Sequence, residues 1–230
     1  MWEPTSSDSA LETEDLGVRR GQRWILRDLS LQVAPGEALG VIGESGAGKT
    51  TLALAILGLL PPSEGSIRMM GLPWSDMSEA QRRPHRPLLQ AVFQDPMASL
   101  PPHRTGWEIL KEPLAVQGPG DEHQRREMAQ AMAERVKFPV EALGQRPHQW
   151  SGGLAQRLCL ARALVLKPRI LVLDEPLSAL DPTLGSYLMS LLLDLKAEGL
   201  SLLFISHHMP AVSRICDRLL LIGPGRAAPG

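Results

Sequence analysis

The chain has 230 residues, a formal net charge of −1 and 43% hydrophobic residues, so it suits one large domain and carries no basic surplus for binding nucleic acid. Its two cysteines, Cys159 and Cys216, form no CxxC pair and no disulfide framework, which favours a reducing compartment. No secretory signal is expected at the start, and the longest apolar run, residues 52–60, is far shorter than the roughly 20 residues of a membrane-spanning helix.

Short strands and turns are predicted for the first part of the chain. Residues 11–19 and 25–33 alternate apolar with polar side chains, as half-exposed antiparallel strands do. A turn at residues 34–37 leads into the apolar run 38–42, which is typical of a buried parallel strand. The remaining predictions here are a loose tail over 1–8, a strand over 65–71, one capped helical turn over 78–81 and a strand over 88–93.

The motif that organises the chain follows the buried strand directly. It reads Gly43-Glu44-Ser45-Gly46-Ala47-Gly48-Lys49-Thr50, which fits the P-loop pattern, and a helix is predicted from Thr51 to residue 60, ended by Pro61. The N–H groups of such a loop and the helix N-terminus converge on phosphate oxygens. Lys49 supplies a charge for the β- and γ-phosphates, and Thr50 is placed to ligate Mg²⁺. We assign all of these residues, with Thr51, to nucleotide binding, because the flanks disfavour an ordinary Gly-rich turn.

A helical insertion interrupts the α/β pattern further along. Residues 97–150 are rich in Pro and His, and their clearest element is an amphipathic helix over 121–136. The core pattern then resumes with a helix over 154–166, a strand over 170–173, a helix opened by Asp181 and Pro182 and ended by Gly199, and strands over 202–205 and 219–222. Strands alternating with helices predict an α/β fold whose mostly parallel sheet is covered on both faces.

Two acids follow the strand predicted over 170–173. Four apolar residues running into Asp174 and Glu175 place both carboxylates at the carboxyl end of a central strand, where open α/β sheets bind ligands. Asp174 is the predicted acid on the Mg²⁺ side, and Glu175 is predicted to polarise an attacking water. Alone, such a pair would more often be a solvated strand end, but the P-loop makes that interpretation unlikely here.

Several further segments resemble the motifs of ATP-binding cassette (ABC) proteins. Ser151-Gly152-Gly153, followed by Gln156-Arg157 and Ala161-Arg162-Ala163-Leu164, resembles the signature motif. Gln94 is similar to the Q-loop, residues 178–181 to the D-loop and Ser206-His207 to the H-loop, and the motifs follow the family order from residue 43 to residue 207. The resemblance implies a P-loop NTPase (RecA-like) core over residues 9–96 and 155–230. It also implies an antiparallel β subdomain and an inserted α-helical subdomain over 97–154, all within one ABC ATPase domain over 1–230.

The resemblance also implies how such a chain works. Two cassettes face each other head to tail, so that Ser151, Gly152 and Gly153 would touch an ATP held by the P-loop of the partner. His207 would contact the γ-phosphate, and Gln94 would sense Mg²⁺ and water while linking to the transporter. The expected partners are a second cassette, a different chain, and two membrane permease subunits, with a periplasmic or extracellular binding protein acting indirectly. The chain would lie peripherally on the cytoplasmic face of the inner membrane.

The sequence departs from the family pattern at a few positions. Trp150 stands where the signature motif usually has Leu, and Leu154 stands where Gln is typical, so we expect weakened rather than abolished activity. At the register where many relatives place an aromatic ring against adenine, this chain has Arg20. Arg20 could stack on the base, or Trp24 could take that role, and the sequence leaves both possibilities open.

Residues 93–96, 99–102 and 108–114 resemble the corresponding segments of the dipeptide, oligopeptide and nickel import branch. Many oligopeptide-type members carry a Pro- and Cys-containing extension after the last core strand. The given sequence shows none, so we expect one of the shorter nickel or metallophore members, although the scattered histidines do not suggest that this chain itself binds nickel. The alternative is a soluble ABC-type ATPase that acts in DNA repair or translation, and a cassette that binds ATP without hydrolysing it is a third possibility. Both are disfavoured, because the chain has one compact cassette, no heptad run and a full set of motif residues. Arg82, Arg83 and Arg86 are expected to lie in a solvated loop.

Overall fold

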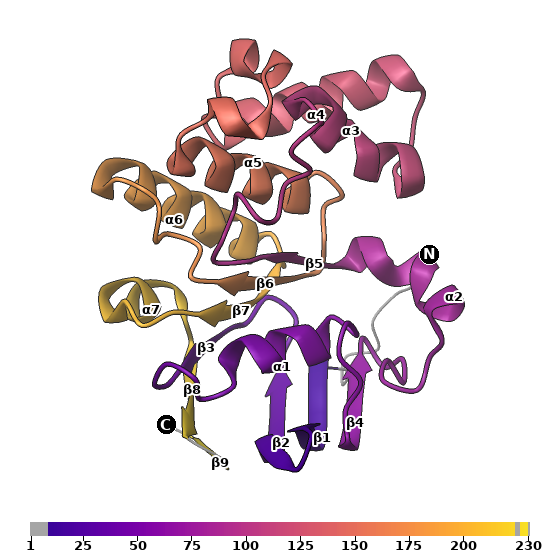
Figure 1. Ribbon diagram of the computed structural model, residues 1–230, viewed down its shortest axis with the longest axis vertical. Coiled ribbons are helices and arrows are strands. Elements are labelled where there is room, and N and C mark those ends of the chain that lie inside the picture. Colours follow the sequence, from indigo (N-terminus) through magenta and orange to yellow (C-terminus); the bar gives the residue numbers. More distant parts are fainter. Residues whose placement is uncertain (1–8, 224–225, 230) are drawn as a thin grey trace.

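Two β-sheets form the frame of the molecule (Figure 1). In the smaller sheet, β2 (Arg23–Val33), β1 (Leu11–Arg20) and β4 (Glu64–Met69) pair antiparallel in that order, as predicted for the first two. The computed structural model describes residues 9–223 and 226–229, so the tail predicted over 1–8 lies outside the described residues. Helix α1 (Lys49–Ile56) lies between the two sheets.

The larger sheet has six strands in the order β5-β6-β7-β3-β8-β9. Five of them run parallel, which confirms the predicted mostly parallel sheet. The strands are β3 (Ala38–Ile42), β5 (Leu89–Val92), β6 (Ile170–Asp174), β7 (Ser201–Ile205), β8 (Arg218–Gly223) and β9 (Arg226–Pro229). The sequence did not predict β9, which pairs antiparallel with β8 at the edge.

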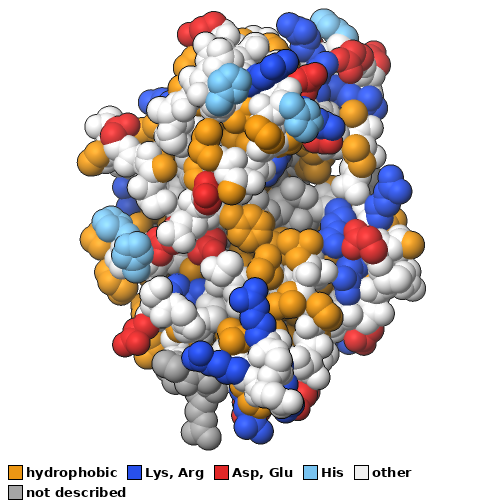
Figure 2. All heavy atoms as spheres, viewed as in Figure 1, with side chains coloured by type: hydrophobic (Ala, Val, Ile, Leu, Met, Phe, Trp, Pro, Cys, Tyr) orange, Lys and Arg blue, Asp and Glu red, His pale blue; other side chains and the backbone are white. Residues whose placement is uncertain are grey.

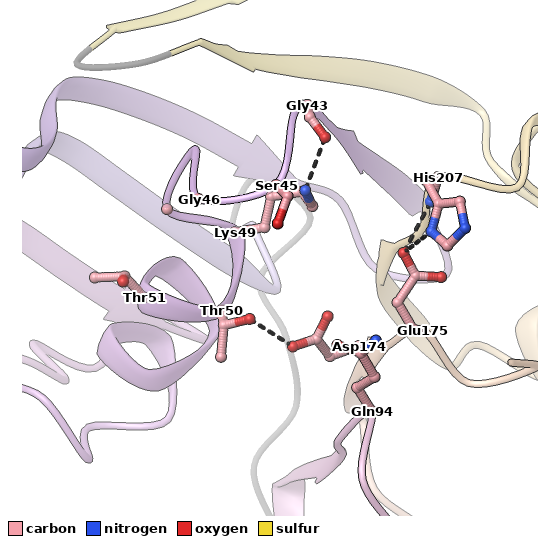
Figure 3. A pocket seen from close by; sticks show the side chains of 11 residues that line it. Gly43, Ser45, Gly46, Lys49, Thr50, Thr51, Gln94, Asp174, Glu175 and His207 are labelled. Atoms are coloured by element: carbon pink, nitrogen blue, oxygen red, sulfur yellow. Dashed lines mark hydrogen bonds and ion pairs between the residues drawn. The ribbon is translucent and has the colours of Figure 1, made fainter. Parts of the chain in front are cut away.

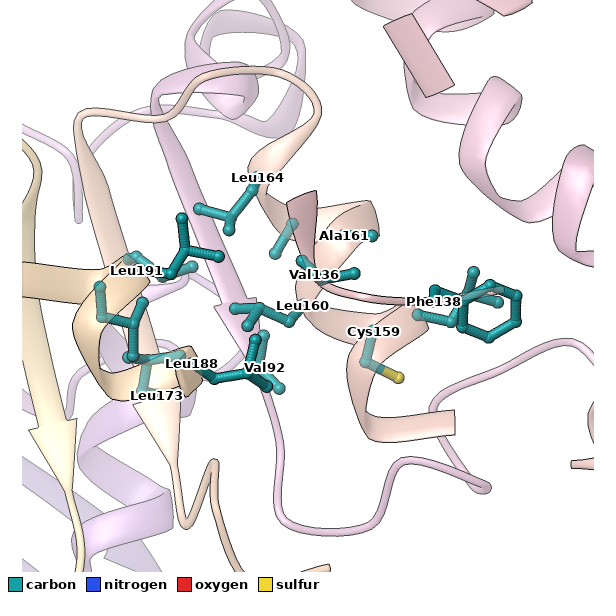
Figure 4. Close-up of a cluster of buried hydrophobic side chains, with 14 of the residues drawn as sticks. Val92, Val136, Phe138, Cys159, Leu160, Ala161, Leu164, Leu173, Leu188 and Leu191 are labelled. Carbon is teal, nitrogen blue, oxygen red and sulfur yellow. The ribbon is translucent and has the colours of Figure 1, made fainter. Parts of the chain in front are cut away.

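Successive residues of the central strands pack into two different cores. On β6, Leu171 and Leu173 face the helices, whereas Ile170 and Val172 face the antiparallel sheet. Because side chains alternate across a strand, a strand buried on both faces must be apolar throughout, which explains its continuous apolar run. Figure 4 shows the helical side of this packing, where Leu160, Leu164, Leu188 and Leu191 gather over Val92 and Leu173.

The helices above the sheet were only partly predicted. Helix α4 (Glu122–Arg135) lies within the predicted range 121–136, with Asp121 as its N-cap, and α6 (Pro182–Ala197) begins after Asp181 with Pro182 in its first turn. Helix α5 (Gly152–Leu164) starts two residues before the predicted range, because Ser151 is its N-cap. The remaining elements of this part are α3 (Gly106–Gln117), α7 (Met209–Ile215) and the 3₁₀ turns Val140–Gly144 and Pro147–Gln149. The sequence analysis missed α3, whose interior Pro113 obscures its capping box of Thr105 and Glu108.

Helix α1 ends four residues earlier than predicted. Pro61 was expected to stop it, but the α-helix stops at Ile56, and Gly58 then takes a left-handed φ of 68°. The N–H groups of Leu59 and Leu60 both donate to the carbonyl of Leu54, which closes the helix end. Glycine adopts this conformation without steric cost, so it ends the helix before the proline is reached.

Two arginines in the segment after β4 hold this end of α1 in place. Helix α2 (Glu79–Arg82), whose capping box of Ser78 and Gln81 was predicted, continues into the 3₁₀ segment Arg83–Leu88. Arg82 donates to the carbonyls of Gly58, Trp74 and Ser75, at 3.1, 2.9 and 3.0 Å respectively. Arg86 donates to the carbonyl of Leu57 at 2.5 Å. The expectation of a solvated loop was therefore wrong for Arg82 and Arg86. Each donates to one carbonyl at the C-terminus of α1, and Arg82 also ties that end to the segment after β4.

Cys159 and Cys216 are both free, and burial raises their pKa values to about 11 and about 12, so both thiols are poor nucleophiles at neutral pH. No helix in the described residues combines the length and apolarity needed to cross a bilayer. Figure 2 shows basic and acidic side chains interspersed over the face in view, as the near-neutral net charge suggests.

We predict that Arg82→Ala destabilises the protein by about 2–3 kcal/mol, because three carbonyl groups lose a charged donor. For a chain of this size, the melting temperature should fall by roughly 4–12 °C, measured by differential scanning calorimetry.

Arg83→Ala is the matched control, since Arg83 is exposed and is the next residue along the chain. It should change stability by less than about 0.5 kcal/mol. Equal losses in the two variants would show that Arg82 has no special role in holding α1.

Candidate functional site

The sheet topology brings four segments to one edge. Strands β5, β6, β7 and β3 are parallel neighbours, so their carboxyl ends lie together and deliver Gln94, Asp174, His207 and the loop at residues 43–48 to the same place. A cavity of about 390 Å³ lies there (Figure 3). Its lining residues are Gly43, Ser45, Gly46, Gly48, Lys49, Thr50, Thr51, Gln94, Asp174, Glu175 and His207. Of the predicted P-loop residues, Glu44 and Ala47 do not line it.

Close packing beneath the loop explains two of its glycines. A Cβ atom on Gly43 would lie 2.3 Å from the carbonyl oxygen of Ile222. Gly48 has a φ of 102°, and a Cβ atom there would lie 2.8 Å from the Leu26 side chain. Any side chain at either position would push the loop away from the sheet, so the backbone N–H groups can approach a ligand only with glycine there.

The ammonium group of Lys49 lies on the inner side of this loop. Its Nζ donates to the carbonyl of Gly43 at 2.7 Å and to that of Glu44 at 2.9 Å (Figure 3). Lys49 is also the first residue of α1, so its charge adds to the partial positive charge of the helix N-terminus. Together they make this end of the cavity electropositive and suited to phosphate oxygens.

Oxygen ligands for a divalent cation lie opposite. Thr50 Oγ1 donates to Asp174 Oδ2 at 2.9 Å, and Gln94 lies beside Asp174 (Figure 3). Asp174 is only 4% exposed, and burial raises the pKa of its carboxyl group, with the Thr50 hydrogen bond opposing that shift. The described residues contain no cluster of three or more His, Cys, Asp or Glu side chains suited to a metal. A hydroxyl, a buried carboxylate and an amide fit Mg²⁺, which prefers oxygen and takes few protein ligands when phosphates supply the rest.

The Glu175 carboxylate is fixed by the segment after β7. Its Oε2 accepts from Ser206 Oγ at 2.9 Å, and its Oε1 accepts from the backbone N–H of His207 at 2.9 Å. The Nδ1 atom of the His207 ring also lies 2.6 Å from Oε1, which directs the Nδ1 proton toward the carboxylate. Glu175 has a left-handed φ of 50°, a conformation that costs energy for a residue other than glycine.

Sequence reasoning gave Ser206 no role of its own. The structure shows that its hydroxyl both holds Glu175 and accepts from the N–H of His208 at 3.1 Å. Its position directly before His207 was the only available signal, because nothing in the sequence shows that the two carboxylate oxygens have different partners.

The other predicted site residues lie away from the cavity lining. Ser151 and Gly152 are exposed at the start of α5, where Ser151 Oγ accepts from the N–H of Leu154 at 3.3 Å, and Gly153 follows them. Arg20 is exposed at the end of β1, paired in register with Arg23. The chain therefore presents a surface at residues 151–153 that is separate from its own phosphate-type cavity.

The side chain of Trp24 is engaged within the β1–β2 hairpin. The Arg19 guanidinium lies 3.8 Å from the ring centroid, and that of Arg27 lies 5.3 Å from it. A Cβ atom on Gly17 would lie 2.8 Å from the ring edge, so glycine makes room for it. These contacts leave Arg20 as the freer of the two candidates for a planar base.

Comparison with protein families gives one match that covers most of the chain. The family model described as "ABC transporter" matches residues 26–178. The oligopeptide transport ATP-binding protein OppF of Escherichia coli K12 is 39% identical over 232 residues, covering 94% of this chain and 70% of that protein. OppF of Haemophilus influenzae is 42% identical, covering 88% and 61%. Relatives from Brucella ovis and Brucella abortus are also 42% identical, and this chain spans 64% of their length.

Solved structures show the same architecture. A dimeric ATP-binding cassette in a post-hydrolysis state, bound to ADP and Pi, matches with a TM-score of 0.87 and 26% identity, covering 95% of this chain and 98% of that one. A nucleotide-free ATP-binding cassette from an ABC transporter matches with a TM-score of 0.82 and 25% identity, covering 96% and 92%. The predicted P-loop NTPase fold, with a parallel and an antiparallel sheet, is therefore confirmed.

We predict that Asp174→Asn raises the melting temperature at about pH 7 by roughly 2–4 °C, or about 1 kcal/mol, because an amide avoids the cost of a buried charge. Burial raises the pKa of Asp174 in the folded protein, so its cost to stability grows as pH rises from the ordinary value through the raised one. The gain should therefore shrink as pH falls through the raised pKa of Asp174, and it should be small at about pH 4, near the ordinary value for a carboxyl group. Thermal melts across this pH range measure the effect.

Asp194→Asn, an exposed change on α6, serves as the control and should alter stability by less than about 0.5 kcal/mol at either pH. A lower melting temperature for Asp174→Asn at neutral pH would contradict this prediction. It would show that the buried Asp174 carboxylate stabilises the folded protein instead of destabilising it.

Proposed function

The chain belongs to the ABC transporter family, and from that membership we propose that it is the ATP-hydrolysing subunit of an ABC importer for peptides. The observation that carries the proposal is the single cavity in which the P-loop, Gln94, Asp174, Glu175 and His207 meet. Relatives named as oligopeptide transport ATP-binding proteins support the import of peptides. Peptides are proposed ahead of nickel or a metal chelate, because the named relatives supply no support for a metal cargo.

The residues of the cavity divide into two binding roles. The loop from Gly43 to Thr51 holds the nucleotide's phosphates through backbone N–H groups, the α1 N-terminus and the Lys49 ammonium. Thr50, Asp174 and Gln94 would hold Mg²⁺, which when bound neutralises charge on the phosphate oxygens. The Thr50–Asp174 hydrogen bond supports this role, because it holds two of these oxygen atoms together.

Glu175 is the proposed group that polarises the attacking water. A carboxylate has about four lone-pair positions, and the hydroxyl of Ser206, the N–H of His207 and its ring take three of them. One acceptor position on Oε2 is left, and a water bound there would be directed by a carboxylate that cannot rotate. The His207 ring, which is 78% exposed, is left to contact the γ-phosphate.

The second half of the nucleotide site is proposed to come from a partner cassette. Ser151, Gly152 and Gly153 stand at the N-terminus of α5 on the surface, outside the chain's own cavity. A serine hydroxyl and free N–H groups at a helix start suit an anion, here the γ-phosphate of ATP held by the other cassette. Arg20 is the proposed contact for adenine. The departures at Trp150 and Leu154 support an unequal pair of two different chains.

The membrane partners are proposed to bind beside Gln94. Met97 and Val116, on the helical part at residues 97–154, are large apolar residues that are 40% and 59% exposed. Exposed apolar area of this kind suits contact with another protein. We propose that two permease subunits dock here and hold the chain on the cytoplasmic face of the inner membrane, with a binding protein acting indirectly. No role in DNA repair or translation is proposed.

We predict that Lys49→Ala abolishes ATP turnover and lowers nucleotide affinity about ten- to a hundredfold, because a charge-assisted contact contributes roughly 1.5–3 kcal/mol. Phosphate release and equilibrium binding of a fluorescent ATP analogue measure the two effects.

Lys167→Ala, an exposed change after α5, is the control and should leave both quantities unchanged. Near-normal turnover by Lys49→Ala would refute the P-loop assignment and, with it, the proposed function.

A further inference from the structure

We propose that Gln156 is a positioning residue that links residues 151–153 to Glu175 of the same chain, so that contact with the partner's nucleotide sets the hydrolytic carboxylate. This inference rests on the proposed function for its consequence, but its structural part does not depend on ATP turnover. Gln156 lies on α5, one helical turn after Gly153, and Pro176 directly follows Glu175.

Gln156 is a buried amide that makes one specific contact. It is 1% exposed, and its Nε2 donates to the carbonyl of Pro176 at 2.9 Å. Within the described residues no donor reaches its Oε1 atom. An amide is costly to bury, and a leucine or methionine would fill the same space more favourably, so packing alone does not explain the residue. The contact with Pro176 is what distinguishes Gln156 from the apolar side chains around it.

The glycines at residues 152 and 153 form a second contact with the same segment. A Cβ atom on Gly153 would lie 3.2 Å from the carbonyl oxygen of Ala179, and one on Gly152 would lie 3.7 Å from the Ala179 Cβ. The start of α5 is therefore packed directly on Ala179 and Leu180, within the segment 176–181. With Gln156 holding one end of that segment and Ala179 touching the glycines, a shift at residues 151–153 must move both.

The end of the segment that Gln156 holds is the end that leads to the carboxylate. Ser178 Oγ donates to the carbonyl of Glu175 at 3.0 Å, which folds the segment back onto that residue. Glu175 has the strained φ of 50°, and its carboxylate is held by Ser206 and His207. A residue other than glycine keeps a left-handed conformation only because the surrounding structure holds it there. Small movements of the residues around Glu175 should therefore change its conformation. Through Pro176, Gln156 fixes the residue next to it.

The test uses Gln156→Met, which keeps the length of the side chain and removes the Pro176 hydrogen bond together with the unpaired Oε1 atom. Leu158→Met is the matched control, because Leu158 is fully buried on the same helix and the change is of similar size. Hydrogen exchange of residues 175–181 is followed by mass spectrometry in the purified protein. The amides of Ser178 and Leu180, which donate to Glu175 and Leu177, should exchange about three- to tenfold faster in Gln156→Met and at the wild-type rate in Leu158→Met.

The same variants are compared in ATP turnover. Gln156→Met should lower kcat about three- to tenfold and leave the KM for ATP within about twofold, because it disturbs the carboxylate and not the phosphate cradle. In a Glu175→Gln background, Gln156→Met should cause no further loss, since both changes act on one group.

Unchanged exchange at residues 175–181 would overturn the proposal, as would equal losses in Gln156→Met and Leu158→Met or losses that add to that of Glu175→Gln. Failure of the proposed function gives a different result: the wild type would hydrolyse ATP no faster than Lys49→Ala. The exchange measurement still decides the role of Gln156 in that case, because it needs no hydrolysis.

Discussion

The hydrogen bond from Thr50 Oγ1 to Asp174 Oδ2 joins two residues that are 124 positions apart. It is possible only because the strands before these residues are parallel and end at the same edge of the sheet, and the whole site depends on this arrangement. Strands β3 and β6 do not pair with each other, since β7 lies between them. Because all three are parallel, the loop after β3 and the acids after β6 still emerge at one edge. Gln94 and His207 arrive there by the same rule, from the neighbouring strands β5 and β7. The order and direction of the strands thus determine where the cavity lies, whichever side chains line it.

The site is less favourable for folding than the core that supports it. Asp174 is buried with a carboxyl group whose pKa is raised by burial, and Glu175 takes a left-handed backbone conformation. Both costs are borne by apolar packing on the two faces of β6 and β7. A bound cation would offset the cost of burying the Asp174 charge. The left-handed conformation of Glu175 directs its carboxylate toward the position proposed for the attacking water. Such local costs are typical of residues kept for binding and chemistry.

The sequence predicted the features that depend on local spacing. The strand-loop-helix order around Lys49, the apolar strand before Asp174 and the N-cap at Asp181 all follow from neighbouring residues and were found as expected. The features it missed depend on contacts between distant segments. The sequence predicts Arg82 as a surface charge, because its three carbonyl partners lie in other segments of the chain. The role of Ser206 likewise depends on its hydrogen bond to Glu175, 31 residues earlier. The end of α1 was misplaced because Gly58 acts before the more conspicuous prolines.

We propose that this chain holds half of each nucleotide site and needs a second cassette for the rest. The most direct measurement compares two rates of ATP turnover per chain: that of the isolated protein over a range of concentrations, and that of the same chain co-expressed with a second, different cassette and two permease subunits. We expect slow turnover that rises with concentration for the isolated chain, and clearly faster turnover that is independent of concentration for the assembly. Full, concentration-independent turnover by an isolated monomer would contradict the composite site, and full activity of a purified homodimer without permeases would contradict the pairing of two different chains.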